Sequence, residues 1–84
     1  MVNQVDFRTT DTALATYLIC SGYTLEEIDY SGPRYEYIFS NTNGILAKAQ
    51  EYSAGRALVD PAAYQRVNRK IARLIKNRRQ WWEE

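Results

Sequence analysis

Histidine is absent from this 84-residue chain, and cysteine occurs once, at Cys20. Histidine is the commonest general base and the commonest metal ligand, so its absence removes the usual basis of acid–base catalysis and of metal binding. A single cysteine excludes an internal disulfide and is typical of a reducing cytosol, although an intermolecular bridge stays open. We therefore expect no enzyme and assign no catalytic residue, no metal and no cofactor.

Long hydrophobic runs are missing as well. No stretch approaches the roughly 18 apolar residues that a membrane span requires. The first residues, MVNQVDFRTTD, lack the charged segment and following apolar run of a signal peptide. We expect a cytoplasmic protein without membrane contact. At this length we expect a single domain over residues 1–84, with its core in residues 5–75 and a frayed tail in residues 80–84.

The first half of the chain has the pattern of a strand, a helix and a hairpin. Apolar and polar residues alternate over residues 5–8, as in a short strand. A helix is expected from about Asp11 to Ser21, with Gly22 as the residue that ends it. The segment YTLEEIDYSGPRYEYIFS, residues 23–40, predicts a β-hairpin that turns at SGPR.

The second half predicts two more helices. One should end near Ser53. Its candidate N-caps are Asn41, Thr42 and Asn43. The sequence ALV, residues 57–59, suits a short strand. Asp60 as N-cap and Pro61 at the first position predict a last helix that runs to about Arg79. The order β-α-β-β-α-(β)-α predicts an α+β domain with a small, mainly antiparallel sheet.

Three segments carry a resemblance to a known family: DTALATYLICSGY, RYEYIF and LVDPAAYQRVNRKIARL. They resemble a family of small uncharacterised domains of bacteria, cyanobacteria and phages. Its pattern is T-D-x-x-L-A-x-x-L, then G-[FY], an aromatic strand, V-D-P and a basic helix. The resemblance covers most of residues 9–75. It implies the fold outline and a bacterial or mobile-element setting, but no activity, because the family has none established.

Positive charge is concentrated in the last helix. Four cations and eight acids precede position 64, whereas seven cations and two acids follow from there. At 100° per residue one side of this helix is apolar, with Tyr64, Val67, Ile71, Leu74 and Ile75. The opposite side carries Arg66, Arg69, Arg73 and Lys76, flanked by Lys70 and Arg79. Like charges at these spacings repel, so the arrangement requires an explanation.

Three interpretations of this basic side stay open. Acids elsewhere in the fold would neutralise a plain solvated surface; the candidates are Glu26, Glu27, Asp29 and Glu36. The cations would otherwise bind nucleic-acid phosphates or an acidic protein surface. Among ligands we favour nucleic acid without strong sequence choice, because a stripe of Arg and Lys is suited to the charge of the phosphate backbone. The rival is a protein-binding module, such as a phage product that blocks a bacterial protein.

The aromatic residues raise two further questions. RYEYIF is similar to the base-stacking strand of RNA-recognition motifs, but exposing Tyr35 and Tyr37 would bury Glu36. We therefore expect those two tyrosines and Phe39 in the core, with base stacking as the alternative. Trp81 and Trp82 would diverge by about 100° on a helix, so at least one should be exposed. Two interpretations stay open: a loose tail with one tryptophan folded back on the domain, or an exposed interface anchor in a homodimer or with a foreign partner.

Overall fold

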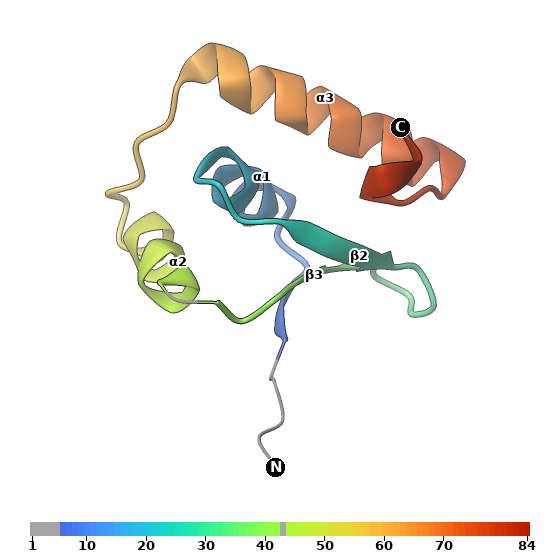
Figure 1. Ribbon diagram of the computed structural model, residues 1–84, viewed down its shortest axis with the longest axis horizontal. Helices are drawn as coiled ribbons and strands as arrows, with labels where there is room; N and C mark the ends of the chain where they lie inside the picture. Colours follow the sequence, from blue (N-terminus) through green and yellow to red (C-terminus); the bar gives the residue numbers. More distant parts are fainter. Residues whose placement is uncertain (1–5, 43) are drawn as a thin grey trace.

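The chain folds into three helices and a three-stranded sheet (Figure 1). The computed structural model describes residues 6–42 and 44–84. The elements are β1 (Phe7–Thr9), α1 (Thr12–Cys20), β2 (Leu25–Asp29), β3 (Glu36–Phe39), α2 (Ile45–Ser53), α3 (Pro61–Asn77) and a 3-10 turn, η1 (Trp81–Glu83). The predicted α+β class and the order of its elements are confirmed. Val5, which the sequence places in the first strand, lies outside the described residues.

The sheet is antiparallel, with strand order β1-β3-β2. Phe7 of β1 and Leu25 of β2 both lie opposite Phe39 of the central strand. A bulge between Leu25 and Glu27 interrupts the alternation of β2, so Glu26 and Glu27 are both exposed. The predicted hairpin is therefore present, and β1 and β2 form the two edges of the sheet.

Carboxylate caps determine where α1 and α3 begin, as the sequence predicts. Asp11 accepts hydrogen bonds from the backbone N–H groups of Ala13 and Leu14, at 3.0 and 3.2 Å. Asp60 accepts one from Ala63 at 3.0 Å, with Pro61 at the first helical position. α3 ends at Asn77, two residues before the expected end, because Arg78 adopts a left-handed conformation with φ of 52°.

The start of α2 differs from the prediction. Its N-cap is Gly44 with φ of 89°, and no side chain caps the helix. Thr42 contributes its backbone carbonyl to the Ile45 N–H at 3.2 Å, and Asn41 is exposed. Asn43 lies outside the described residues. A Cβ at Gly44 would lie 2.9 Å from the Tyr23 hydroxyl, so the left-handed turn and the close packing both favour glycine here.

The buried core joins α1 to the sheet and to the other helices. Its fully enclosed side chains include Leu18 of α1, Ile28 of β2, Ile45 of α2 and Leu74 of α3. In Figure 1, α3 crosses above α1, and α2 lies beside α1. The helices thus cover one face of the sheet, and the outer side of α3 faces solvent.

The aromatic strand agrees with the sequence in part. Tyr37 and Phe39 are completely buried, as expected, but Tyr35 is 39% exposed because β3 begins one residue later, at Glu36. The expectation that Tyr35 belongs to the core is wrong. Ile38 is also buried although alternation directs it to the opposite face of the central strand. Glu36 is partly exposed and pairs with Arg8 at 3.2 Å.

Residues 57–59 do not form the optional strand. They belong to the link between α2 and α3, which runs away from the sheet (Figure 1). Leu58 is 90% exposed. A strand-like composition has no pairing partner at this place, so the segment stays irregular. Among residues 6–42 and 44–84, no helix is both long enough and apolar enough to cross a membrane.

Candidate nucleic-acid interface

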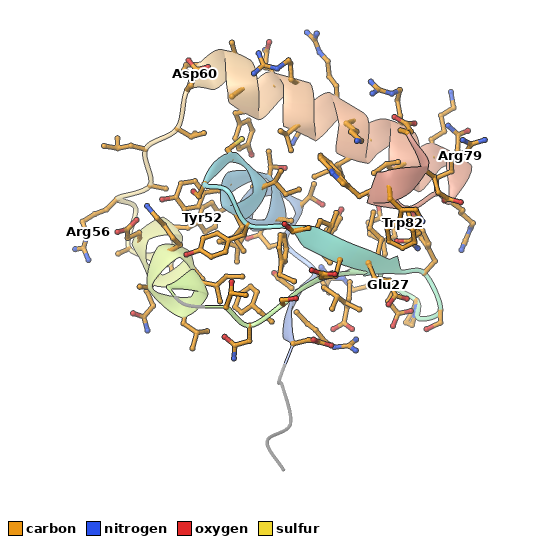
Figure 2. All side chains as sticks on the ribbon, viewed as in Figure 1. Glu27, Tyr52, Arg56, Asp60, Arg79 and Trp82 are labelled. Atoms are coloured by element: carbon orange, nitrogen blue, oxygen red, sulfur yellow. The ribbon has the colours of Figure 1, made fainter. Side chains whose placement is uncertain are left out.

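The outer side of α3 presents a row of cations to solvent. We call Arg66, Arg69, Arg73 and Lys76 the basic face, and all four residues are exposed. Ile71 and Leu74 on the opposite side are buried, as the helical wheel predicts. Figure 2 shows nitrogen-tipped side chains projecting from α3 away from the core, and Arg79 near its end. The separation into an apolar and a cationic side is therefore real.

The acids of the sheet do not contact the basic face. Asp29 and Glu36 flank Arg8, whose guanidinium lies 3.8 and 3.2 Å from their carboxylates. Glu26 accepts a hydrogen bond from the Ser40 hydroxyl at 3.0 Å. Glu27 is exposed and lies on the other side of β2 from α3 in Figure 2. The interpretation in which these four acids neutralise α3 by contact is wrong.

One acid does reach the basic face, and it comes from the tail. Arg73 donates from Nε and Nη2 to the same oxygen of Glu84, at 3.3 and 3.2 Å. Within residues 6–42 and 44–84, this is the one ion pair made by a cation of α3. A carboxylate is thus held where an anionic ligand of Arg73 would bind.

The tail, for which the sequence predicts fraying, makes several contacts with the rest of the domain. After Arg78 the chain turns back, and the Gln80 side chain bonds to β2. It accepts from the Ile28 N–H at 2.7 Å and donates to the Ile28 carbonyl at 2.9 Å. Gln80 and Glu83 also cap each other across η1. The bond between Gln80 and Ile28 joins distant parts of the chain, so the local sequence pattern gives no sign of it.

The two tryptophans point in different directions, as expected. Trp81 packs against the core, and the Lys70 ammonium lies 3.8 Å from the centre of its ring. Trp82 is 65% exposed. Lys70 is therefore engaged in a cation–π contact and is less available than the cations of the basic face. Of the predicted interface pair, Trp82 alone has a large free surface.

Arg78 is a cation whose role the sequence does not reveal. It caps α3 and lies over the Tyr30 ring, 5.5 Å from its centre. The Tyr30 hydroxyl donates to the carbonyls of Leu74 and Arg79, at 3.0 and 2.7 Å. The hairpin and the end of α3 are thereby joined. A tyrosine more than forty residues away gives no local signal of such a contact.

Reactive chemistry has no clear place in the described part of the chain. Burial raises the pKa of the Cys20 thiol, against a smaller opposing effect of Arg66, so the thiol stays protonated at neutral pH. Cys20 is partly buried near the end of α1. Across residues 6–42 and 44–84, no group of three His, Cys, Asp or Glu side chains is placed to hold a metal ion.

The fold and the basic face together define a class: small α+β domains with one strongly basic, solvent-facing helix. The chain belongs to a family described as a domain of unknown function (DUF5659), whose model matches residues 4–79. No curated protein and no solved structure matches the chain. The expected resemblance to a family of small domains without an established activity is thus confirmed.

Proposed function

We propose that this protein is a non-enzymatic binding module that holds the phosphate backbone of a nucleic acid on the basic face of α3. The observation that carries the proposal is the exposure of Arg66, Arg69, Arg73 and Lys76, while the acids of the sheet are paired or lie elsewhere. We place it in a bacterium, encoded by a phage or another mobile element, as the family resemblance implies, and in the cytoplasm, which its single cysteine favours.

Helix geometry supports a contact with several phosphates at once. Arg66 to Lys76 covers about 15 Å of helix at 1.5 Å per residue. Guanidinium and ammonium groups along that length suit repeated negative charges, and they carry no preference for a base sequence. Lys70 and Arg79 extend the positive field on either side of the basic face. The repulsion among these cations is relieved when phosphates bind, which favours the complex.

Binding across a salt series tests the proposal. We expect affinity for a labelled DNA duplex to fall as a power of salt concentration, with a slope that corresponds to roughly two to four neutralised phosphates. Replacing Arg69 and Arg73 together by Ala should lower that slope by about two. Arg56→Ala is the matched control, since Arg56 is an exposed cation at the far end of the molecule from Arg79 (Figure 2).

The control separates local contact from overall charge. Arg56→Ala should leave the slope unchanged, whereas Arg69→Ala alone should lower it by about one. Equal effects of the two single substitutions would mean that net charge, not the basic face, determines binding. No binding at low salt would remove the proposal.

The exposed Trp82 favours a second candidate, an interface with a protein. A large aromatic side chain that is 65% exposed is a common anchor of protein interfaces, in a homodimer or with an acidic partner such as a blocked host protein. If Trp82 anchors a dimer, the protein sediments as a dimer at micromolar concentration and Trp82→Ala is a folded monomer. Trp81→Ala should instead lower stability, because Trp81 packs against the core. A monomeric wild type contradicts the dimer.

A further inference from the structure

A groove runs along one flank of α3, beside the basic face, and has a volume of about 340 Å³. We call it the Tyr35 groove; its lining includes Tyr35, Asn68, Ile71, Ala72, Ile75 and Lys76. Its walls are mainly apolar, and Lys76 belongs to both the groove and the basic face. A ligand that follows the basic face therefore passes the opening of an apolar recess.

Tyr35 is a fixed aromatic surface in this groove. Its ring makes edge contacts with Tyr30 and Tyr37, each with 6.2 Å between ring centres. Tyr37 is completely buried, and the Tyr30 hydroxyl is bonded to the end of α3. Because both neighbours are held, the Tyr35 ring keeps its place, yet 39% of the residue stays exposed. An ordered, half-exposed ring beside an apolar recess is suited to stacking.

Each of the two clefts that Tyr35 lines also has a cation in its lining. Lys76 lines the Tyr35 groove, and Arg34 lines a second cleft of about 320 Å³ that shares Thr12 and Tyr35 with it. Neither Lys76 nor Arg34 has an ion-pair partner within residues 6–42 and 44–84. An anionic chain that occupies both clefts meets Tyr35 in each of them, because Tyr35 lines both.

From this arrangement we propose that the Tyr35 groove takes an unpaired nucleobase of a single strand, stacked on Tyr35, with its flanking phosphates at Lys76 and Arg34. The proposal rests on the proposed function of the basic face and makes its ligand more specific. Aromatic side chains in a positively charged groove are the arrangement by which proteins hold single strands without reading their sequence. Paired bases in a duplex hide their faces, so the groove adds affinity for a single strand and none for a duplex.

This site differs from base stacking on the open face of a sheet. Tyr37 is buried under α1 and donates to or accepts from the Thr12 hydroxyl at 2.8 Å, so it offers no platform. Tyr35 precedes the strand and reaches the side of α3 instead. The platform is therefore formed by the hairpin and the helix together, and Glu36 does not have to be buried.

An abasic strand is the probe that isolates the base. We would measure fluorescence anisotropy with a labelled oligothymidylate of about 12 nucleotides and with an abasic strand of the same length and charge. The wild type should bind the base-bearing strand roughly 5- to 150-fold more tightly, the ratio expected for one stacked base. Tyr35→Ala should abolish this ratio, and Tyr35→Phe should keep it.

Ala72→Leu is the second variant, because Ala72 is exposed at the groove and a larger side chain without an aromatic ring narrows the recess and offers no stacking surface of its own. It should lower the ratio while leaving duplex affinity and its salt slope unchanged. Melting curves verify that each variant folds; if Tyr35→Ala does not, Ala72→Leu with Tyr35→Phe carries the test. Equal wild-type binding of both strands, or an unchanged ratio in Ala72→Leu, overturns the groove alone. Absence of binding to every strand at low salt overturns the basic face as well.

Discussion

Glu84 shows how one residue can control access to the basic face. Its carboxylate lies 3.2 Å from the Arg73 guanidinium, and the Arg73 side chain is 58% exposed. An exposed pair of this kind contributes at most about 1 kcal/mol to stability, since water screens it. Glu84 nevertheless pairs with Arg73, which under the proposed function binds a phosphate.

We therefore predict that Glu84→Gln raises affinity for a DNA duplex by a few fold and changes the melting temperature little. The physical reason is that the phosphate no longer competes with a carboxylate for Arg73. Anisotropy titrations at fixed salt, with a thermal melt of each protein, measure both quantities. Unchanged affinity would show that Arg73 does not contact the ligand.

Asp29 is expected to make the stability of the fold depend on pH in the acidic range. Hydrogen bonds from Ser31, first from its hydroxyl and then from its backbone N–H, lower the pKa of Asp29 from 3.8, and Arg8 adds to the effect. A lowered folded pKa stabilises the fold above the unfolded value of about 4. That contribution is lost as the pH falls through the folded pKa.

Asp29→Asn should accordingly lower the melting temperature at pH 7, and its difference from the wild type should shrink as the pH falls through the folded pKa of Asp29, because the wild-type carboxylate is then protonated. Melting curves from pH 7 downward for both proteins measure the effect. Ser31→Ala is the control, because it should raise the pKa of Asp29 toward its ordinary value. The same difference in melting temperature between the wild type and Asp29→Asn at every pH would contradict the lowered pKa of Asp29.

Among the elements, α3 depends on its N-cap residue, Asp60. We predict that Asp60→Ala costs about 1 kcal/mol of unfolding free energy, because the Ala63 N–H loses its acceptor at 3.0 Å. Asp60→Asn retains the acceptor and should cost less. Ligand affinity of the folded protein should stay constant in both, since Asp60 lies beyond the basic face. Urea denaturation and anisotropy measure the two properties, and a large affinity loss at unchanged stability would make Asp60 a binding residue.

The edge of β2 depends on Gln80 in a similar way. Removing its amide leaves the N–H and carbonyl of Ile28 without partners in a partly buried place. We predict that Gln80→Ala lowers the unfolding free energy by about 1 to 3 kcal/mol, the cost of unpaired buried polar groups. Gln80→Glu keeps the acceptor for the Ile28 N–H. It should lose less stability at low pH than at pH 7, because a protonated carboxyl can also donate to the Ile28 carbonyl. Wild-type stability of Gln80→Ala in urea would show that water replaces the amide.

Local signals account for what the sequence predicts correctly. Asp11, Asp60 and Pro61 act on backbone groups within three residues, so the caps are visible without the fold. The apolar side of α3 likewise follows from spacing along one helix. These features also predicted the basic face, which is the candidate site.

Contacts between distant residues account for what it does not predict. Gln80 and Ile28 are 52 positions apart, and nothing near either of them indicates the contact. Alternation places Tyr35 in the core, but the strand begins one residue later and the residue lines a groove beside α3. Residues 57–59 have the composition of a strand without a neighbouring strand to pair with. Each error concerns a partner that only the fold supplies.

At the scale of the whole molecule, charge is separated between two sides. Cations dominate the outer side of α3, whereas acids gather around Arg8 on the sheet. The principal extents are 40 × 31 × 22 Å, and electrostatic interactions in physiological salt are screened over about 8 Å. We therefore expect the acidic side to have little influence on the affinity of the proposed ligand of α3.

This separation gives a prediction that complements the one for Glu84. Glu27→Gln changes the net charge by the same amount as Glu84→Gln, but on the far side of β2 (Figure 2). We expect it to change duplex affinity less than about twofold in physiological salt, because screening removes its effect at that distance. Anisotropy titrations of the two variants side by side make the comparison. Equal gains would mean that overall charge, and not the position of the charge, determines affinity.

The bond between Gln80 and β2 has a consequence for how the protein is made. A ribosome adds residues from the N-terminus, so Ile28 emerges 52 residues before the side chain that covers its backbone. At about 5 to 20 residues per second, the outer edge of β2 waits roughly 3 to 10 seconds for its partner. During that interval the nascent chain presents an open strand edge, which is the element most prone to pair with another chain. The exposed Glu26 and Glu27 on that strand supply repulsion between nascent copies until Gln80 arrives.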